Sequence, residues 1–390
     1  MPPRRRRHDA AVMALRKPPA IQLAIRPARL DDIPALLALE NSAFVTDRVS
    51  ARSFRHLLTR ANAATLVEEH RGVLRGYATL LFNRASSLAR LYSFAVSPDH
   101  RGLGIAKALL AEAERVALAR GCVYLRLEVR KDNFEAKELY RRMGYREFGV
   151  AADYYDDHMD AIRMEKPLSA SLKPALLRVP YSPQTLEFTC GPAALMMAMH
   201  ALDPRIPLDR TLELRIWRES TTIFMTTGHG GCSPFGMALS AVARGFAVEV
   251  YVNDRGILFE DTVRKPEHKE VIRLVQEDFL AEMREKGVGL HYGRLGVEDL
   301  ECESEAGGIP IVLISSFRID RDREPHWVVV TGFDERFIYV HDPFVDWKGH
   351  RTTTDCVNMP IAKNDFERMA RFGRAQQKAA LVIRKRKGGA

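Results

Sequence analysis

Cys190 stands where a cysteine can become a nucleophile. In the stretch QTLEFTCGPAAL, Pro192 and a long apolar run follow it directly. Proline suits the first turn of a helix because its missing N–H has no partner there, so Cys190 is predicted at a helix N-terminus. The partial positive charge of that end favours a thiolate. Gln184, six residues earlier, carries an amide that could donate to an oxyanion.

A predicted hairpin near the end of the chain offers a base for this thiol. HWVVVTGF and FIYVHDP read as two strands around the turn at 334–336. This pairing places His326 opposite residues 342–345, beside Asp342. Facing side chains in such a pair lie ~4.5–5.5 Å apart at Cβ, and an aspartate there orients the imidazole. The sequence thus predicts a Cys190–His326–Asp342 site. The alternative is that Cys190 is a small buried residue.

A second candidate site lies in VSPDHRGLGIAKALL, which reads as a strand, a glycine-rich turn and a helix. Gly102 and Gly104 would let the backbone approach a ligand, and the first N–H groups of the helix would point at an anion. A plain turn gives the same pattern, so the signal is weak alone. The residues of this expected phosphate loop are Arg101, Gly102, Leu103, Gly104, Ile105, Ala106 and Lys107.

Arg101, Gly104 and Ala106 resemble the central motif of the GNAT acetyltransferases. The resemblance runs from Ile21 to Pro167 and is strongest for the ribosomal-protein alanine N-acetyltransferases. LEVRKDNFEAKELYRRMGY and YYDDHMDAIRMEKPL carry it further. It implies an α/β GNAT fold, a mixed sheet flanked by helices, with acetyl-CoA as co-substrate.

The resemblance also implies how this co-substrate is held. Phe94, Ala95 and Val96 would hold the pantetheine arm along a splayed strand. The backbone from Gly102 to Lys107 would cradle the pyrophosphate, and Asn133 would contact the cofactor arm.

Two further residues match the family's acid and base. Glu128 would take a proton from the acceptor amine, and Tyr140 would protonate the leaving thiolate. Tyr154 and Tyr155 are candidates to line the acceptor groove. The alternatives are an exposed strand carboxylate for Glu128, a helix N-cap for Asn133, and packing for the three tyrosines.

The second half resembles the bacteriocin-processing cysteine peptidases, which cut leader peptides after a double glycine. The matching pieces are Gln184, Cys190-Gly191-Pro192, His326 and Asp342-Pro343. Thr189 replaces the family's usual aspartate before the cysteine, which bears on the leader-peptide substrate more than on the chemistry. The resemblance implies a papain-like α+β fold and thiol-dependent peptide cleavage. Two alternatives are a degenerate domain that binds a peptide or partner, and amide transfer from an acyl-enzyme.

The glycine-rich stretch TTGHGGCSP places His229 and Cys232 at a ligand-like spacing. A second pair of ligands is not evident, so no metal site is predicted. His229 could replace His326 as the base, but it lacks an obvious carboxylate partner.

Composition points to a cytoplasmic protein with peptide or protein substrates that carry a free amine. The sequence lacks an apolar run of the ~20 residues that cross a bilayer, so no membrane partner is expected. Five cysteines without CxxC pairs suggest a reducing compartment. The net charge of +9 arises at the two ends of the chain, +5 within residues 1–20 and +4 within 381–390. Nucleic acid is therefore not expected beyond weak contacts by these basic tails.

The patterns predict two domains. A basic tail covers 1–20, the GNAT domain 21–167, a linker 168–175 and the papain-like domain 176–390. Apolar periodicity predicts helices that end at Gly121 and Gly144, a helix that begins at Cys190, and others over 206–220, 234–244 and 266–287. Strands are expected at 246–252, 308–316, 326–333, 337–343 and 380–386.

Overall fold

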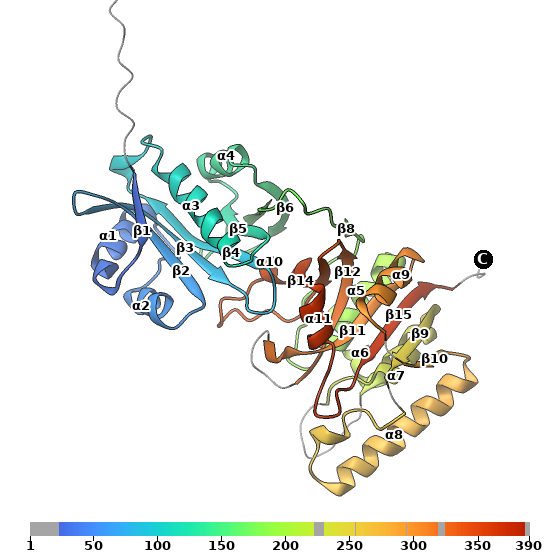
Figure 1. The fold of residues 1–390 in the computed structure, drawn as a ribbon. Coiled ribbons are helices and arrows are strands. Elements are labelled where there is room, and N and C mark those ends of the chain that lie inside the picture. The colour runs from blue at the N-terminus through green and yellow to red at the C-terminus, as the bar shows by residue number, and fades with distance from the viewer. Residues whose placement is uncertain (1–22, 222–229, 254, 294, 319–323, 387–390) are drawn as a thin grey trace, which may run out of the picture.

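The computed structural model describes residues 23–221, 230–253, 255–293, 295–318 and 324–386. It contains two domains, each built on its own sheet (Figure 1). This confirms the expected class, a GNAT-like α/β unit followed by an α+β unit. The expected tail at 1–20, His229 and Lys387 lie outside the described residues.

The first sheet has the strand order β1-β2-β3-β4-β5-β7-β6, with β4 and β5 parallel and the other neighbours antiparallel. Alternation along β2 shows how both faces are covered, because Leu66 packs with α3 and the next residue, Val67, packs with α1 and α2. The strands are β1 (Ala24–Pro27), β2 (Ala63–His70), β3 (Val73–Phe82), β4 (Leu88–Val96), β5 (Tyr124–Arg130), β6 (Arg146–Ala151) and β7 (Ala161–Pro167). The helices are α1 (Ile33–Ala43), α2 (Ala51–Thr59), α3 (Ile105–Ala119) and α4 (Phe134–Arg142).

The second sheet has the order β10-β9-β15-β11-β12-β13-β14, and β8 pairs with β12. One face packs on α5, α6 and α7, and the other on α9 and α11. The strands are β8 (Ala175–Leu176), β9 (Phe246–Val252), β10 (Gly289–Tyr292), β11 (Ile309–Ser315), β12 (Pro325–Phe333), β13 (Phe337–His341), β14 (Met359–Ala362) and β15 (Ala379–Lys385). The helices are α5 (Cys190–Leu202), α6 (Arg210–Ser220), α7 (Pro234–Ala243), α8 (Pro266–Glu285), α9 (Val297–Glu305), α10 (Thr353–Cys356) and α11 (Lys363–Met369).

Local signals predicted most of these elements. Gly121 and Gly144 follow α3 and α4 with φ of +78° and +89°, the left-handed conformation that ends many helices. The helix expected from residue 206 begins instead at Arg210, because Asp209 caps it by accepting from the N–H of Leu212 at 2.8 Å. Ala175, expected in a linker, pairs with Phe333 as part of β8.

The domains meet where α10 and β14 lie beside β4 and β5 (Figure 1). Tyr124 of β5 packs against Tyr339 of β13 with ring centroids 6.5 Å apart. The guanidinium of Arg126 donates to the carbonyls of Thr354 at 2.9 Å and Val357 at 2.5 Å. Since Arg126 is only 2% exposed, these bonds satisfy a charge that is buried between the domains.

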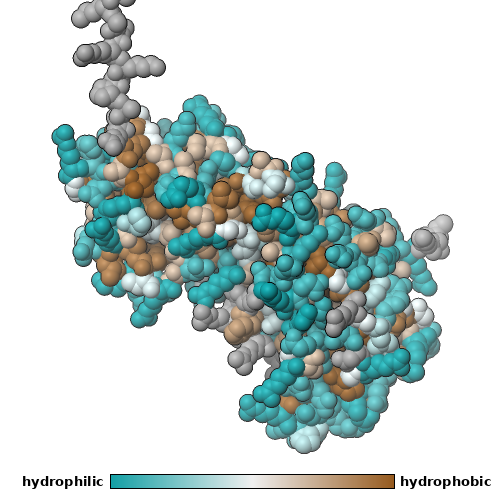
Figure 2. All heavy atoms as spheres, viewed as in Figure 1, coloured by the Kyte–Doolittle hydropathy of each residue, from teal (hydrophilic) through white to brown (hydrophobic). Residues whose placement is uncertain are grey.

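Figure 2 shows a mostly hydrophilic face, with hydrophobic residues in small patches on both domains. In the part of the chain that the structure describes, no helix has both the length and the apolar character needed to cross a bilayer.

Candidate active sites

The loop before α3 has the form of an anion cradle. Gly104 is the N-cap of α3 and has a φ of +80°, and no side chain supplies a cap bond to the first turn. A β-carbon added at Gly102 or Gly104 would meet nothing within 4 Å. Open space therefore lies beside a glycine turn at a helix N-terminus, which fits the pyrophosphate of acetyl-CoA.

Two neighbouring strands, β4 and β5, diverge next to this loop, as the GNAT resemblance implies. β4 and β5 pair only from Leu88 opposite Tyr124 to Leu91 opposite Leu127. Beyond that point Phe94, Ala95 and Val96 pair with β3 on their other side. In the segment 94–96, the backbone edge toward β5 is therefore free of sheet pairing and is available to an extended ligand arm.

Tyr140 belongs to α4, and Asn133 lies directly before it. Asn133 is its N-cap, since the side-chain oxygen accepts from Ala136 at 3.0 Å, as the alternative interpretation expected. Its exposed amide nitrogen is not needed for that bond. Tyr140 is buried, with its ring 6.4 Å from that of Phe94. Burial raises the pKa of Tyr140, so the phenol keeps its proton at neutral pH and can donate it.

Glu128 of β5 is not an exposed carboxylate. Its side chain is 5% exposed, and its Oε1 lies 3.2 Å from the guanidinium of Arg90. The hydroxyl of Thr352, from the second domain, also donates to Oε1, at 2.8 Å. Glu128, whose position matches the general base of the GNAT family, is thus contacted by residues of both domains.

Tyr154 and Tyr155 lie between β6 and β7. Their rings are 5.0 Å apart, and the ring of Tyr154 is 6.4 Å from that of Trp347 in the second domain. Burial raises the pKa of both tyrosines, and the nearby Glu128 raises it further. Glu128 thus influences both phenols, and the two tyrosines stay candidates to line an acceptor groove.

Cys190 is the first residue of α5, as its sequence predicts. The glycine that follows it is required by packing, because a β-carbon at Gly191 would lie 2.8 Å from the sulfur of Met237 and 3.2 Å from Trp327. The start of α5 is thereby pressed against α7 and β12. This places Cys190 beside the strand that carries His326.

The expected hairpin of β12 and β13 forms, with Val329 opposite His341. His326 Nε2 lies 2.7 Å from Oδ1 of Asp342, and both residues are buried. Arg351 donates to Oδ2 of Asp342 at 2.6 Å, and the N–H of Phe344 donates to Oδ1 at 2.9 Å. The carboxylate is therefore fixed on both oxygens, and it fixes the imidazole in turn.

The electrostatics of this group favour a charged imidazole. Burial alone would lower the pKa of His326, but the Asp342 carboxylate and the neighbouring Cys190 raise it to about 10. Burial would raise the pKa of Asp342, whereas Arg351 and His326 hold it well below its ordinary value. His326 is thus protonated at neutral pH, and its charge lies beside Cys190.

Gln184 is placed less simply. Its Nε2 donates to the carbonyls of Leu186 at 2.8 Å and Glu187 at 2.9 Å. Both amide hydrogens are engaged within its own loop, so a role as oxyanion donor requires one of these bonds to be exchanged. Thr189 stands where the peptidases that the second half resembles usually have an aspartate. Its hydroxyl donates to the buried carboxylate of Glu213.

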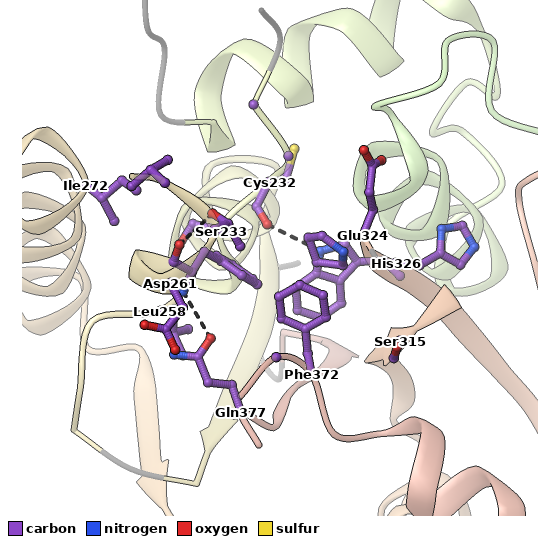
Figure 3. Close-up of a pocket in the computed structure, with 18 of the residues that line it drawn as sticks. Cys232, Ser233, Leu258, Asp261, Ile272, Ser315, Glu324, His326, Phe372 and Gln377 are labelled. Carbon is purple, nitrogen blue, oxygen red and sulfur yellow. Dashed lines mark hydrogen bonds between the residues drawn. The ribbon is translucent and has the colours of Figure 1, made fainter. Parts of the chain in front are cut away.

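Cys190 and His326 line a cleft of about 1510 Å³ between the start of α5, α8 and the segment 371–377. Figure 3 shows Cys232 and Ser233 on one side of it and Glu324 and His326 on the other. Cys232 is also close to Cys190, but burial raises its pKa well above the ordinary value. Cys232 is therefore a poor nucleophile. Its backbone carbonyl accepts a hydrogen bond from the indole N–H of Trp327 at 3.3 Å.

Within the described ranges, no group of three or more His, Cys, Asp or Glu side chains could hold a metal ion. The residues that sequence reasoning missed are Arg90, Thr352, Arg351 and Glu213. Arg90, Thr352 and Glu213 act through contacts with residues at least 24 positions away. Arg351 reaches Asp342 nine positions away, so no local pattern marks any of the four.

Comparisons with known proteins match the two parts of the chain that contain these residues. Residues 179–384 match the Peptidase_C39 like family, and residues 31–145 match the Acetyltransferase (GNAT) family. A Bacillus subtilis (strain 168) protein named for alanine N-acetylation of ribosomal protein bS18 is 30% identical over 135 residues, 35% of this chain and 88% of that relative. An uncharacterized N-acetyltransferase of Methanocaldococcus jannaschii is 34% identical over 145 residues, 37% of this chain and 91% of that relative.

The crystal structure of the ribosomal-protein-S18-alanine N-acetyltransferase from Escherichia coli covers 39% of this chain and 97% of its own. It is 27% identical, with a TM-score of 0.36. The sequence matches confirm both family resemblances drawn from the sequence.

Proposed function

The chain belongs to the Peptidase_C39 like family and carries a GNAT N-acetyltransferase domain ahead of that region, and we propose that both domains are active enzymes. The first transfers an acetyl group from acetyl-CoA to the amine of a peptide or protein. The second cleaves peptides with Cys190. The relatives named for alanine acetylation of a ribosomal protein favour a peptide N-terminus as the acceptor.

For acetyl transfer, acetyl-CoA supplies the activated thioester. The residues that would hold it are the loop 101–107, the strand segment 94–96 and Asn133. The observation that supports this binding is the open glycine turn at the start of α3 beside the splayed end of β4.

Two side chains then move the protons. Glu128 accepts the proton of the acceptor amine, directly or through water, so that its nitrogen lone pair can attack the acetyl carbonyl. Tyr140 gives its proton to the leaving sulfur. Its buried phenol is neutral, which is the form this step requires.

For cleavage, the observation that supports the proposal is the contact of His326 with Asp342 at a cleft that Cys190 also lines. The thiolate of Cys190 attacks the peptide carbonyl, and the imidazolium of His326 gives its proton to the departing amine. A water molecule, deprotonated by His326, then releases the acyl group. Gln184 is the candidate donor to the oxyanion, after exchange of one of its loop bonds.

We place the GNAT domain at 21–167 and the peptidase domain at 176–390, in a reducing cytoplasm. All five cysteines are free thiols, which agrees with such a compartment. Limited proteolysis should release two stable pieces with a cut between 168 and 175. Cutting at other sites first would require new bounds.

Mass spectrometry of a peptide library tests both activities together. With acetyl-CoA, we expect peptides acetylated at their N-termini, and without it, cleaved peptides only. Products whose new C-terminal carbonyl has combined with another amine, and not with water, would indicate amide transfer. Intact peptides in both arms would leave the second domain as a binding module and would contradict a peptide acceptor.

A further inference from the structure

Thr352 belongs to the second domain but directs its hydroxyl at the first. It is the N-cap of α10, where its N–H donates to Oδ2 of Asp355 at 2.8 Å. This bond fixes the backbone of Thr352 from within its own domain. The hydroxyl is then presented in a set direction.

The hydroxyl meets Arg90 and Glu128, residues far from it in sequence. Arg90 donates to Oγ1 of Thr352 at 2.9 Å, and Thr352 donates to Oε1 of Glu128 at 2.8 Å. Arg90 also donates to the backbone carbonyl of His350, so it grips the same segment twice. The Arg90 side chain is 3% exposed and that of Glu128 is 5% exposed, so water competes little for these bonds.

The two oxygens of Glu128 are not equivalent. Among the described residues, the bonds from Arg90 and Thr352 both fall on Oε1. Oε2 is left to accept a proton. A base needs this arrangement, since one oxygen anchors the carboxylate while the other faces the substrate.

We propose that Thr352 is a positioning residue of acetyl transfer, supplied by the Peptidase_C39 like domain to the acetyltransferase domain. The proposal rests on the role of Glu128 as base in the proposed function. It makes the acetyltransferase site incomplete without the second domain.

Removal of the hydroxyl has a predictable effect on geometry. Without the bond from Thr352, Oε1 of Glu128 keeps only the bond from Arg90 among the described residues, so the carboxylate is held less firmly for proton transfer. The other groups that face Glu128 stay in place in this variant: Arg90 on β4, Arg163 on β7, Tyr154 and Tyr155 between β6 and β7, and Asp355 on α10.

The test uses the full chain, acetyl-CoA and a synthetic peptide with an N-terminal alanine. Thr352→Val keeps the shape and deletes the hydroxyl, and Thr352→Ser keeps the hydroxyl. We expect Thr352→Val to lower kcat about tenfold, with the KM for the peptide and the affinity for acetyl-CoA unchanged. Thr352→Ser should restore kcat.

Thr331→Val is the matched control. Thr331 is buried in the second domain, and its hydroxyl has no hydrogen-bond partner among the described residues. Its variant should keep the wild-type kcat and KM. Melting temperatures of all variants check the fold, and Thr352→Ala replaces the valine variant if that one unfolds.

The outcomes separate the two hypotheses. If Glu128→Gln is inactive but Thr352→Val keeps the wild-type kcat, this inference is wrong and the proposed function stands. If Glu128→Gln transfers as fast as the wild type, the base assignment is wrong and the inference falls with it. A wild-type protein that binds acetyl-CoA but acetylates no peptide amine would overturn both.

Discussion

Glu128 and Asp342 are both buried carboxylates beside an arginine, yet they differ in how many of their oxygens accept hydrogen bonds. Asp342 accepts from His326 and Phe344 on one oxygen and from Arg351 on the other. Among the described residues, Glu128 accepts its hydrogen bonds on Oε1, from Arg90 and Thr352. A carboxylate engaged on both oxygens can orient a neighbour and hold charge. One with an oxygen to spare can also accept a proton.

The same contrast extends to the partners of each carboxylate. In the mechanism proposed for the acetyltransferase domain, the proton leaves through Glu128 and returns through Tyr140, two residues on different elements. In the mechanism proposed for the second domain, His326 performs both steps and Asp342 only holds it. The predicted losses on mutation should follow this division of labour.

The largest expected effect is at Cys190, the proposed nucleophile of the site that contains Asp342. Cys190→Ala should abolish peptide cleavage and leave acetyl transfer within about twofold, since Cys190 contacts neither Glu128 nor the α3 loop. Cleavage and acetylation of the same peptides, followed by mass spectrometry, measure both. Cys302→Ala, a change at an exposed thiol, is the control. Cleavage retained in a folded Cys190→Ala protein would remove the peptidase assignment from this site.

The next effect tests the carboxylate with the free oxygen. Glu128→Gln keeps the size and the bond from Thr352 but removes the base, so transfer should fall by ~10²–10⁴. Acetyl-CoA affinity, measured by calorimetry, should change little, because the cofactor loop is separate. A rate within a few fold of the wild type would mean that the amine loses its proton to another group or to water.

How much of this could be read from the sequence depended on distance along the chain. The α3 loop and its helix are contiguous, and glycine spacing with apolar periodicity marks them. The pairing of His326 with Asp342 was predictable because a hairpin fixes which residues face each other. Cys190 at a helix start followed from Pro192 alone.

The contacts that hold these residues were not predictable. Arg90 and Thr352 are 262 residues apart, and Arg351 reaches Asp342 across a loop with no period. An arginine on a strand looks the same whether it faces water or another domain. The bonds of Gln184 to its own loop depend likewise on backbone conformation that residue types do not fix.

A smaller effect is expected at the acid that complements Glu128. Tyr140→Phe deletes one hydroxyl from a buried ring, and turnover should fall at least about tenfold with acetyl-CoA affinity kept. Tyr145→Phe is the matched control, because its ring also packs in this core, 5.7 Å from Tyr140. Equal losses in the two variants, read with their melting temperatures, would assign Tyr140 to packing.

The smallest effect concerns the carboxylate that only orients. Asp342→Asn keeps a hydrogen-bonding group beside His326 but removes its charge, so cleavage at neutral pH should fall about tenfold, less than in Cys190→Ala. Loss of the carboxylate lets burial lower the pKa of His326 from about 10. The reactive pair needs a protonated imidazole, so the alkaline limb of the cleavage rate should move to lower pH. Asp334→Asn, at the far end of the same hairpin, should leave that limb in place. An alkaline limb unchanged in Asp342→Asn would mean that Asp342 does not hold the charge of His326, and that cleavage in the second domain does not depend on a carboxylate-paired imidazolium beside Cys190.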